Sequence, residues 1–155
     1  MQLSTKGRYA VRAMFDLAFY SKGEPVPLSR ISEREDISLH YLEQLFNKLR
    51  RGGVVESVRG PAGGFRLSRK ASEITVEEII RIVEGSIMPV ECVDDNKKNK
   101  KGCLRAEKCI THVLWKRLGK HIVDFLAGVS LQDLVDEARE LVESDKVSHG
   151  FMFNI

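Results

Sequence analysis

Three cysteines and one histidine lie within 21 residues of this chain, and the chain has no other cysteine. They are Cys92, Cys103, Cys109 and His112. Three thiolates and one imidazole complete a four-coordinate metal site, and thiolate-rich sites hold zinc or an iron–sulfur centre. This group of side chains therefore predicts metal binding.

The spacing of these four residues is C-x10-C-x5-C-x2-H. It lacks the short C-x2-4-C knuckle of zinc fingers and ribbons, so zinc is the weaker assignment. A histidine in place of a fourth cysteine makes an iron–sulfur cluster less negative and adds a protonatable ligand, which suits a sensor. From the residues alone, a cluster, a zinc site and thiols without a metal all stay open.

Composition places the chain among soluble globular proteins. It has 155 residues, 43% of them hydrophobic and 30% charged, enough for one compact domain or a small module with an appendage. No apolar run reaches the roughly 20 residues of a membrane span, and the N-terminus lacks a secretory core. We expect a cytoplasmic protein without a membrane partner, in which clustered cysteines bind metal rather than form disulfides.

Elements able to position these residues follow from hydrophobic periodicity. Helices are predicted over residues 4–20, 28–35 and 38–51, with Ser38 as the cap of the third helix and the glycine pair 52–53 as its stop. The second and third helices flank a short turn, which is the helix-turn-helix arrangement.

Strand patterns over residues 54–58 and 65–68 enclose a glycine-rich loop and predict a hairpin, that is, a wing. The loop GPAGG lacks the Lys-Ser/Thr of a nucleotide-binding P-loop. No nucleophile–base pair or paired carboxylates stand out, so we do not expect an enzyme.

The second half is predicted to be helical around one long loop. A capping box at residues 75–78 opens a helix that ends near Gly85, and residues 86–107 read as a loop. A long helix runs from Cys109 to about Ala127, and Ser130 caps a last helix to about Val142. No element is predicted for the tail, residues 144–155.

The fold expected is mostly α with a small β-hairpin wing. It comprises a winged helix-turn-helix domain (1–84), a cluster-binding loop (85–112), and a dimerisation helix with a C-terminal helix (113–143). The long helix carries more apolar surface than the small module can cover, so pairing of two chains is favoured over packing against the first helix.

Charge and helix position predict a DNA surface. Residues 1–70 carry 13 Lys and Arg against 7 Asp and Glu, which suits a polyanion. The exposed start of a second helix in this motif reads base edges, and Arg59 on the wing can enter the minor groove. The residues expected to read bases are Ser38, His40, Tyr41, Glu43 and Gln44, and those expected on phosphates are Lys6, Arg8, Arg50 and Arg51.

Four segments strongly resemble the IscR-type iron–sulfur cluster regulators. They are LSTKGRYAVRAMFDLA, PVPLSRISEREDISLHYLEQLF, LRRGGVVESVRGPAGGFRLS and CITHVLWKRL, and the resemblance runs from about Met1 to Leu141. It implies a homodimer on a pseudo-palindromic double-stranded DNA operator, paired through the long helix. It also implies a [2Fe-2S] cluster on Cys92, Cys103, Cys109 and His112, supplied by the iron–sulfur assembly machinery.

The resemblance implies a transcriptional repressor of cluster-assembly genes that senses iron–sulfur status. One departure is the ten residues between the first two cysteines, where family members typically have about five. Lengthening a flexible loop costs only a fraction of a kcal/mol, so the extra residues can bulge outward. The alternatives are a regulator of nitric oxide or oxidative-stress responses, a zinc-stabilised DNA-binding protein, and an iron–sulfur carrier without a DNA target.

Overall fold

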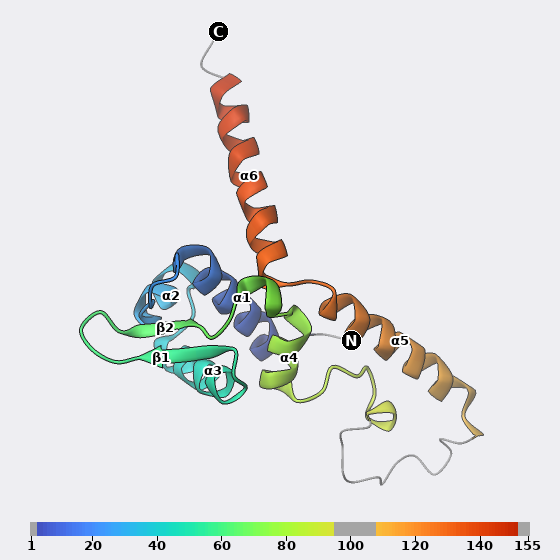
Figure 1. The fold of residues 1–155 in the computed structure, drawn as a ribbon. Helices are drawn as coiled ribbons and strands as arrows, with labels where there is room; N and C mark the ends of the chain where they lie inside the picture. The colour runs from blue at the N-terminus through green and yellow to red at the C-terminus, as the bar shows by residue number, and fades with distance from the viewer. Residues whose placement is uncertain (1–2, 95–107, 152–155) are drawn as a thin grey trace.

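A computed structural model describes residues 3–94 and 108–151 of the chain. Over these residues the order of elements is α1 (Thr5–Tyr20), α2 (Leu28–Glu35), α3 (Leu39–Arg51), β1 (Val55–Val58), β2 (Gly64–Leu67), η1 (Ala71–Glu73), α4 (Val76–Glu84), η2 (Glu91–Val93), α5 (Ile110–Ala127) and α6 (Leu131–Phe151). Helices α1 to α4 and the hairpin form one body, from which α5 and α6 extend (Figure 1). None of the described helices combines the length and apolar content needed to cross a bilayer.

The predicted helix-turn-helix is confirmed in α2 and α3. Asp36 ends α2 in the left-handed region at φ 51°, and the Ser38 hydroxyl then caps α3 by accepting the Tyr41 N–H at 3.3 Å. Both helices turn their apolar residues toward α1, and the shared core is fully buried. It includes Ala10, Met14, Leu17, Ile31, Leu42, Phe46, Leu49 and Ile79. Burial of this one core fixes α3 relative to the rest of the domain.

The predicted wing is confirmed as the antiparallel pair β1–β2, with Val55 opposite Leu67. The Phe65 ring of β2 meets the Phe46 ring of α3 edge-on, with centroids 5.0 Å apart. Gly64 begins β2 at φ 154°, where an added Cβ would lie 2.4 Å from the Val26 carbonyl carbon. Only glycine permits that approach, so the root of the wing is tied to the chain before α2.

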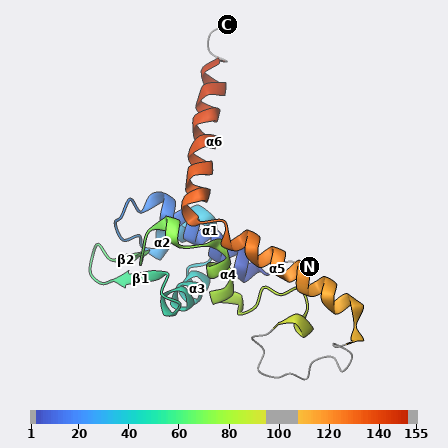
Figure 2. The same cartoon turned by 45° about the vertical axis from the view of Figure 1, so that its right-hand side comes forward.

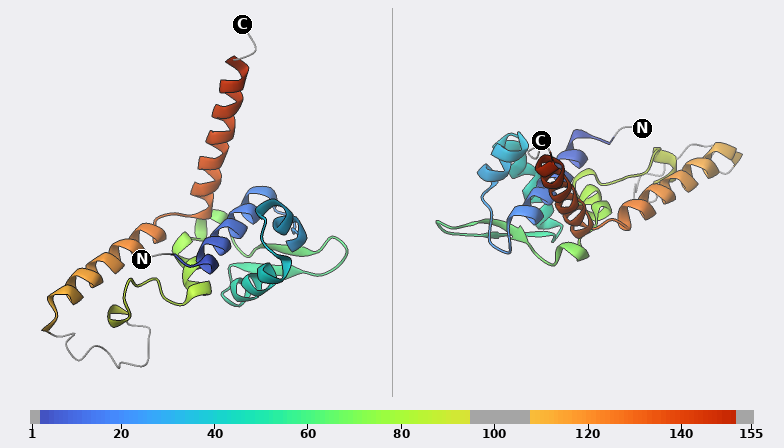
Figure 3. Two further views of the ribbon diagram at one scale, coloured as in Figure 1. Left: turned by 180° about the vertical axis from the view of Figure 1, so that it is seen from behind. Right: turned by 90° about the horizontal axis from the view of Figure 1, so that it is seen from above.

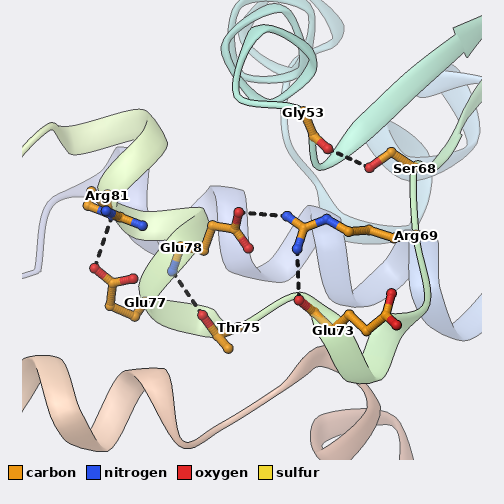
Figure 4. A network of polar contacts seen from close by, with 8 residues as sticks. All are labelled: Gly53, Ser68, Arg69, Glu73, Thr75, Glu77, Glu78 and Arg81. Carbon is orange, nitrogen blue, oxygen red and sulfur yellow. Dashed lines mark hydrogen bonds and ion pairs between the residues drawn. The ribbon is translucent and has the colours of Figure 1, made fainter.

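The base of the wing is also tied to α4 (Figure 4). Arg69 follows β2 and pairs with Glu78 of α4, with Nη2 and Oε1 2.6 Å apart. Ser68 donates its hydroxyl to the Gly53 carbonyl at 2.5 Å. Thr75 caps α4 by accepting the Glu78 N–H at 3.2 Å, as its capping pattern predicts. The wing and α4 therefore move as one unit with the core.

Helix α5 presents two different faces and runs away from the body (Figure 2). One face packs against α4 and η2 and is half-buried or buried. It consists of His112, Trp115, Gly119, Ile122 and Leu126, at the 3–4 spacing of one helical stripe. A second face is an exposed apolar stripe formed by Ile110, Leu114, Leu118 and Phe125, with Ile110 83% and Phe125 70% exposed.

Helix α6 packs on α1 and η1 through Leu131 and Val135, then stands away from the body (Figures 1 and 3). It continues to Phe151, so the prediction that residues 144–155 hold no element is wrong up to Phe151. The reason is helix propagation. Once the first turns are fixed, each further residue adds one hydrogen bond, and no proline or glycine interrupts the chain before Gly150.

Candidate DNA interface and metal centre

A buried ion pair holds α2 against α1. Asp16 is fully buried, and Arg34 donates to both of its carboxylate oxygens, from Nε at 2.7 Å and from Nη2 at 2.6 Å. The guanidinium also stacks on the Tyr20 ring, 4.3 Å from the centroid. The hydrogen bonds to Asp16 raise the pKa of Arg34. The only signal for this pair in the sequence is an aspartate inside an apolar helical stripe, and our sequence analysis missed it.

The first turns of α3 bring four of the predicted base-reading residues onto one exposed surface. Ser38, His40, Glu43 and Gln44 are all exposed. The Gln44 amide nitrogen and His40 Nε2 are 3.0 Å apart, and His40 Nδ1 is 3.9 Å from Glu43 Oε2. The three longer side chains thus orient one another, which arranges hydrogen-bonding groups for base edges.

Tyr41 differs from its four neighbours. It is half-buried, and its ring meets the Tyr9 ring edge-on with centroids 5.9 Å apart. The ring therefore joins α3 to α1. We had placed Tyr41 on the same free face as Gln44, whereas packing occupies much of its surface.

The basic residues expected on phosphates fall at separate places. Arg59 is exposed directly after β1, where the Gly63 N–H donates to the Gly60 carbonyl at 2.9 Å and turns the hairpin. Lys6 and Arg8 are exposed on the first turns of α1. Exposed Arg50 and Arg51 end α3, about 15 Å along the axis from His40. The last two residues are thus not part of the surface around His40.

The start of α5 brings two candidate metal ligands together. Cys109 immediately precedes the helix, and His112 lies one turn later on the same side. Hydrogen bonds from the Thr111 hydroxyl, whose oxygen is 3.1 Å from the Cys109 sulfur, and from the His112 N–H lower the pKa of the Cys109 thiol. A lowered pKa favours the thiolate, which is the metal-binding form.

His112 also has an unused ligand atom. Its ring is half-buried, and its Nδ1 is buried without a hydrogen-bond partner among the described residues. Burying a polar nitrogen unpaired is costly, and coordination to a metal removes that cost. The residues at the start of α5 therefore fit a metal or cluster.

The other two candidate ligands are placed less closely. Cys92 is exposed in η2, which packs against α5, and Cys103 lies outside the described residues. Among the side chains that the structure describes, no three His, Cys, Asp or Glu converge closely enough to hold a metal ion. The geometry therefore joins Cys109 with His112 and puts Cys92 on a neighbouring element.

Gly119 fixes the path of the chain that leads to Cys92. It is buried, and an added Cβ would lie 2.6 Å from the Met88 sulfur and 3.1 Å from Pro89 Cδ. Cys92 follows Pro89 by three residues, a reach of about 10 Å. His112 precedes Gly119 by seven residues, about 10 Å along the helix. Crossing at Gly119 therefore keeps Cys92 within reach of His112.

Gly119→Val is expected to lower the apparent affinity for the bound metal centre about tenfold, as changes behind metal ligands commonly do. The added methyl groups would push Met88 and Pro89 away from α5. Iron and sulfide content after anaerobic reconstitution measures the effect. Adding Met88→Ala to Gly119→Val should partly restore that content. Gly128→Ala is the matched control, because its Cβ meets only atoms at 3.4 Å or beyond. Equal iron content in Gly119→Val and wild-type protein would contradict this role.

Comparison with known proteins identifies the family of this chain. The model of the family described as "Rrf2: Iron-dependent Transcriptional regulator" matches residues 3–137. The HTH-type transcriptional regulator IscR of Erwinia tasmaniensis is 48% identical over 146 residues, which cover 94% of this chain and 86% of that protein. IscR of Photorhabdus laumondii is 48% identical over 141 residues, covering 91% and 83%. These relatives are named as transcriptional regulators, a role without catalysis.

Solved structures show the same fold. T. potens IscR has a TM-score of 0.73 and 38% identity, covering 91% of this chain and 90% of that one. CymR of B. subtilis, titled its global cysteine regulator, has a TM-score of 0.71 and 36% identity, covering 88% and 98%. The chain belongs to the Rrf2 family of iron-dependent transcriptional regulators.

Proposed function

We propose that this protein is a homodimeric repressor whose choice of DNA operator is controlled by a [2Fe-2S] cluster. One observation carries the proposal. The Nδ1 of His112, which is buried and has no partner among the residues that the structure describes, lies one turn from the Cys109 thiol. Its helix packs against the helix-turn-helix domain. A regulator without a metal has no evident use for that nitrogen. The genes controlled would be those for cluster assembly, as the family resemblance implies.

The cluster would be held by Cys92, Cys103, Cys109 and His112, and it would be supplied by the assembly machinery. When bound, such a group supplies a redox-active, oxygen-sensitive centre. The chain's own contribution is to present a thiol of lowered pKa and the buried imidazole nitrogen of His112 at the start of α5. The path across Gly119 brings the Cys92 segment to the same face.

Dimerisation would use the exposed stripe of α5. Ile110, Leu114 and Phe125 are each more than half exposed in the single chain, and a stripe of this kind on one helix is typical of a buried helix–helix contact. Two-fold pairing would set two α3 helices about 34 Å apart, in successive major grooves of a pseudo-palindrome.

A mechanical connection supports control of DNA binding from α5. Helix α4 packs against both α3 and α5, so it lies between the reading helix and the cluster segment. Lys48 of α3 donates its ammonium to the Val83 carbonyl near the end of α4, at 3.3 Å. Ordering of the segment after α4 would therefore shift the balance between orientations of the reading helices.

A footprinting titration of the metal-free and reconstituted proteins on the same set of DNA sites tests the proposal. We expect the two forms to rank the sites differently, with reconstituted protein coloured and containing sulfide. Identical ranking would refute the switch. Colourless protein that binds zinc in stoichiometric amount would favour the zinc-stabilised alternative instead.

Gln44→Ala is expected to cost about 1–3 kcal/mol in specific DNA affinity, because a glutamine pairs bidentately with an adenine edge. Non-specific affinity and cluster content should stay unchanged, since the side chain is exposed and distant in sequence from the ligands. Competition binding between operator and random duplex measures the change. An unaltered sequence preference would show that α3 does not read bases through Gln44.

A further inference from the structure

The first turn of α1 is held by a carboxylate from the end of α4. Glu84 Oε1 accepts the Gly7 N–H at 2.9 Å, and it also accepts the Ser4 hydroxyl. The Ser4 oxygen in turn accepts the Lys6 N–H at 3.1 Å. N–H groups in a first helical turn have no partner within the helix, and a negative charge there also suits the helix dipole. Glu84 therefore completes the cap of a helix 77 residues away in sequence.

The fit on the α1 side of this contact is close. Gly7 is buried, and an added Cβ would lie 3.0 Å from Glu84 Oε1 and 3.5 Å from Leu3. The backbone of α1 thus approaches the carboxylate more closely than a larger residue allows without displacement. These hydrogen bonds thus connect the start of α1 to the end of α4 at one defined contact.

Apolar packing is incomplete beside this contact. A cavity of about 280 Å³ lies beside it, lined by residues that include Leu3, Ser4, Glu84, Met88 and Ile122. Side chains next to a cavity lose van der Waals contacts on one side. Hydrogen bonds to Glu84 therefore add to the apolar packing of α1 on α4 in holding the first turn of α1.

We infer that Glu84 is a positioning residue for DNA backbone contacts made by Lys6 and Arg8. These two exposed side chains flank Gly7 on the turn that Glu84 holds. The inference rests on the proposed function, because it takes Lys6 and Arg8 as phosphate contacts. If the turn frays, neither cation is held at a fixed position relative to the phosphate backbone. The charge of Glu84 acts in the opposite direction, since a carboxylate repels phosphate.

The salt dependence of binding separates these two effects. For the full chain and a short random-sequence DNA duplex, the slope of log Kobs against log salt counts phosphate contacts at about 0.9 each. Glu84→Ala is expected to reduce the magnitude of the slope by about 1.8, the value for two lost contacts. The affinity deficit then grows about tenfold as salt falls from about 0.2 M to about 0.05 M. Glu84→Gln keeps an acceptor oxygen without the charge, so its slope should stay close to that of the unchanged protein.

The reference variant is Lys6→Ala/Arg8→Ala, which should show the same reduced slope. Adding Glu84→Ala to that double variant should not reduce the slope further, because the contacts that Glu84 positions are already gone. A substitution that merely destabilises the fold would not reduce the slope in the unchanged protein and leave it as it is in the double variant. If Glu84→Ala fails to fold, Gly7→Ala replaces it in the test. This variant displaces the carboxylate without removing it, so its slope should be intermediate.

Each outcome points to one conclusion. An unchanged slope in Glu84→Ala, with a reduced slope in the Lys6/Arg8 double variant, overturns the inference and leaves the proposed function standing. An unchanged slope in the double variant overturns both the phosphate assignment and the inference. A slope in Glu84→Gln as low as in Glu84→Ala also overturns the inference, because the acceptor oxygen would then be irrelevant. The footprinting titration tests the cluster-dependent switch separately.

Discussion

Cys109→Ala is expected to yield colourless protein after anaerobic reconstitution, with at least about tenfold less iron and acid-labile sulfide per chain than the unchanged protein. The thiol is one of four proposed ligands, and hydrogen bonds that lower its pKa prepare it for binding. Alanine cannot coordinate iron, and the Nδ1 of His112 would again lack a partner. In footprinting, the variant should rank DNA sites as the metal-free protein does.

Thr111→Ala is the matched control for this substitution. It removes the hydroxyl 3.1 Å from the Cys109 sulfur but leaves every proposed ligand in place. The thiol pKa should rise toward its ordinary value, and the coloured protein should still form. Full iron and sulfide in Cys109→Ala would mean that the centre uses other ligands. Cys92→Ala, Cys103→Ala and His112→Ala extend the same test.

Arg34→Ala is expected to destabilise the folded protein by about 3 kcal/mol or more, because it leaves the fully buried Asp16 carboxylate without its partner. A buried carboxylate without its partner retains its desolvation cost. Equilibrium unfolding in urea, followed by circular dichroism, measures the change. DNA binding should fall with the folded fraction, since the pair fixes the first helix of the helix-turn-helix.

Asp16→Ala should cost less than Arg34→Ala, because the Arg34 side chain is 31% exposed and can be hydrated once its partner is gone. Arg30→Ala serves as the control for removing an arginine from α2. Its pair with Glu33 is an exposed contact at 3.5 Å, worth less than about 0.5 kcal/mol. Equal effects of Arg30→Ala and Arg34→Ala would contradict the role given to burial.

Local signals in the sequence were enough to predict most elements. Ser38 and the glycines after Arg51 define α3, and Thr75 defines the start of α4, because caps act through hydrogen bonds to adjacent residues. The Asp16–Arg34 pair and the contacts of Glu84 could not be predicted in this way. They join residues from different helices, and their partners emerge only when the helices pack.

The same distinction, between features set by local sequence and features set by packing between helices, applies to the candidate sites. The proposed base-reading surface lies at the start of a helix, so the exposure of Gln44 and His40 could be predicted from periodicity alone. Tyr41 occupies the same turn, but its packing on Tyr9 depends on where α1 lies. The role of Gly119 was missed because a glycine inside a helix carries no periodic signal, and only the crossing chain gives it a purpose.

The two faces of α5 have a consequence for how the length of this chain can vary in evolution. Each residue of a helix turns the next by about 100°, so a single insertion between His112 and Leu126 would rotate the downstream part of both faces out of phase at once. Residues added before Lys108 leave that phase untouched. We therefore expect insertions and deletions to be tolerated ahead of the helix, where ten residues separate Cys92 from Cys103, and to be selected against within it.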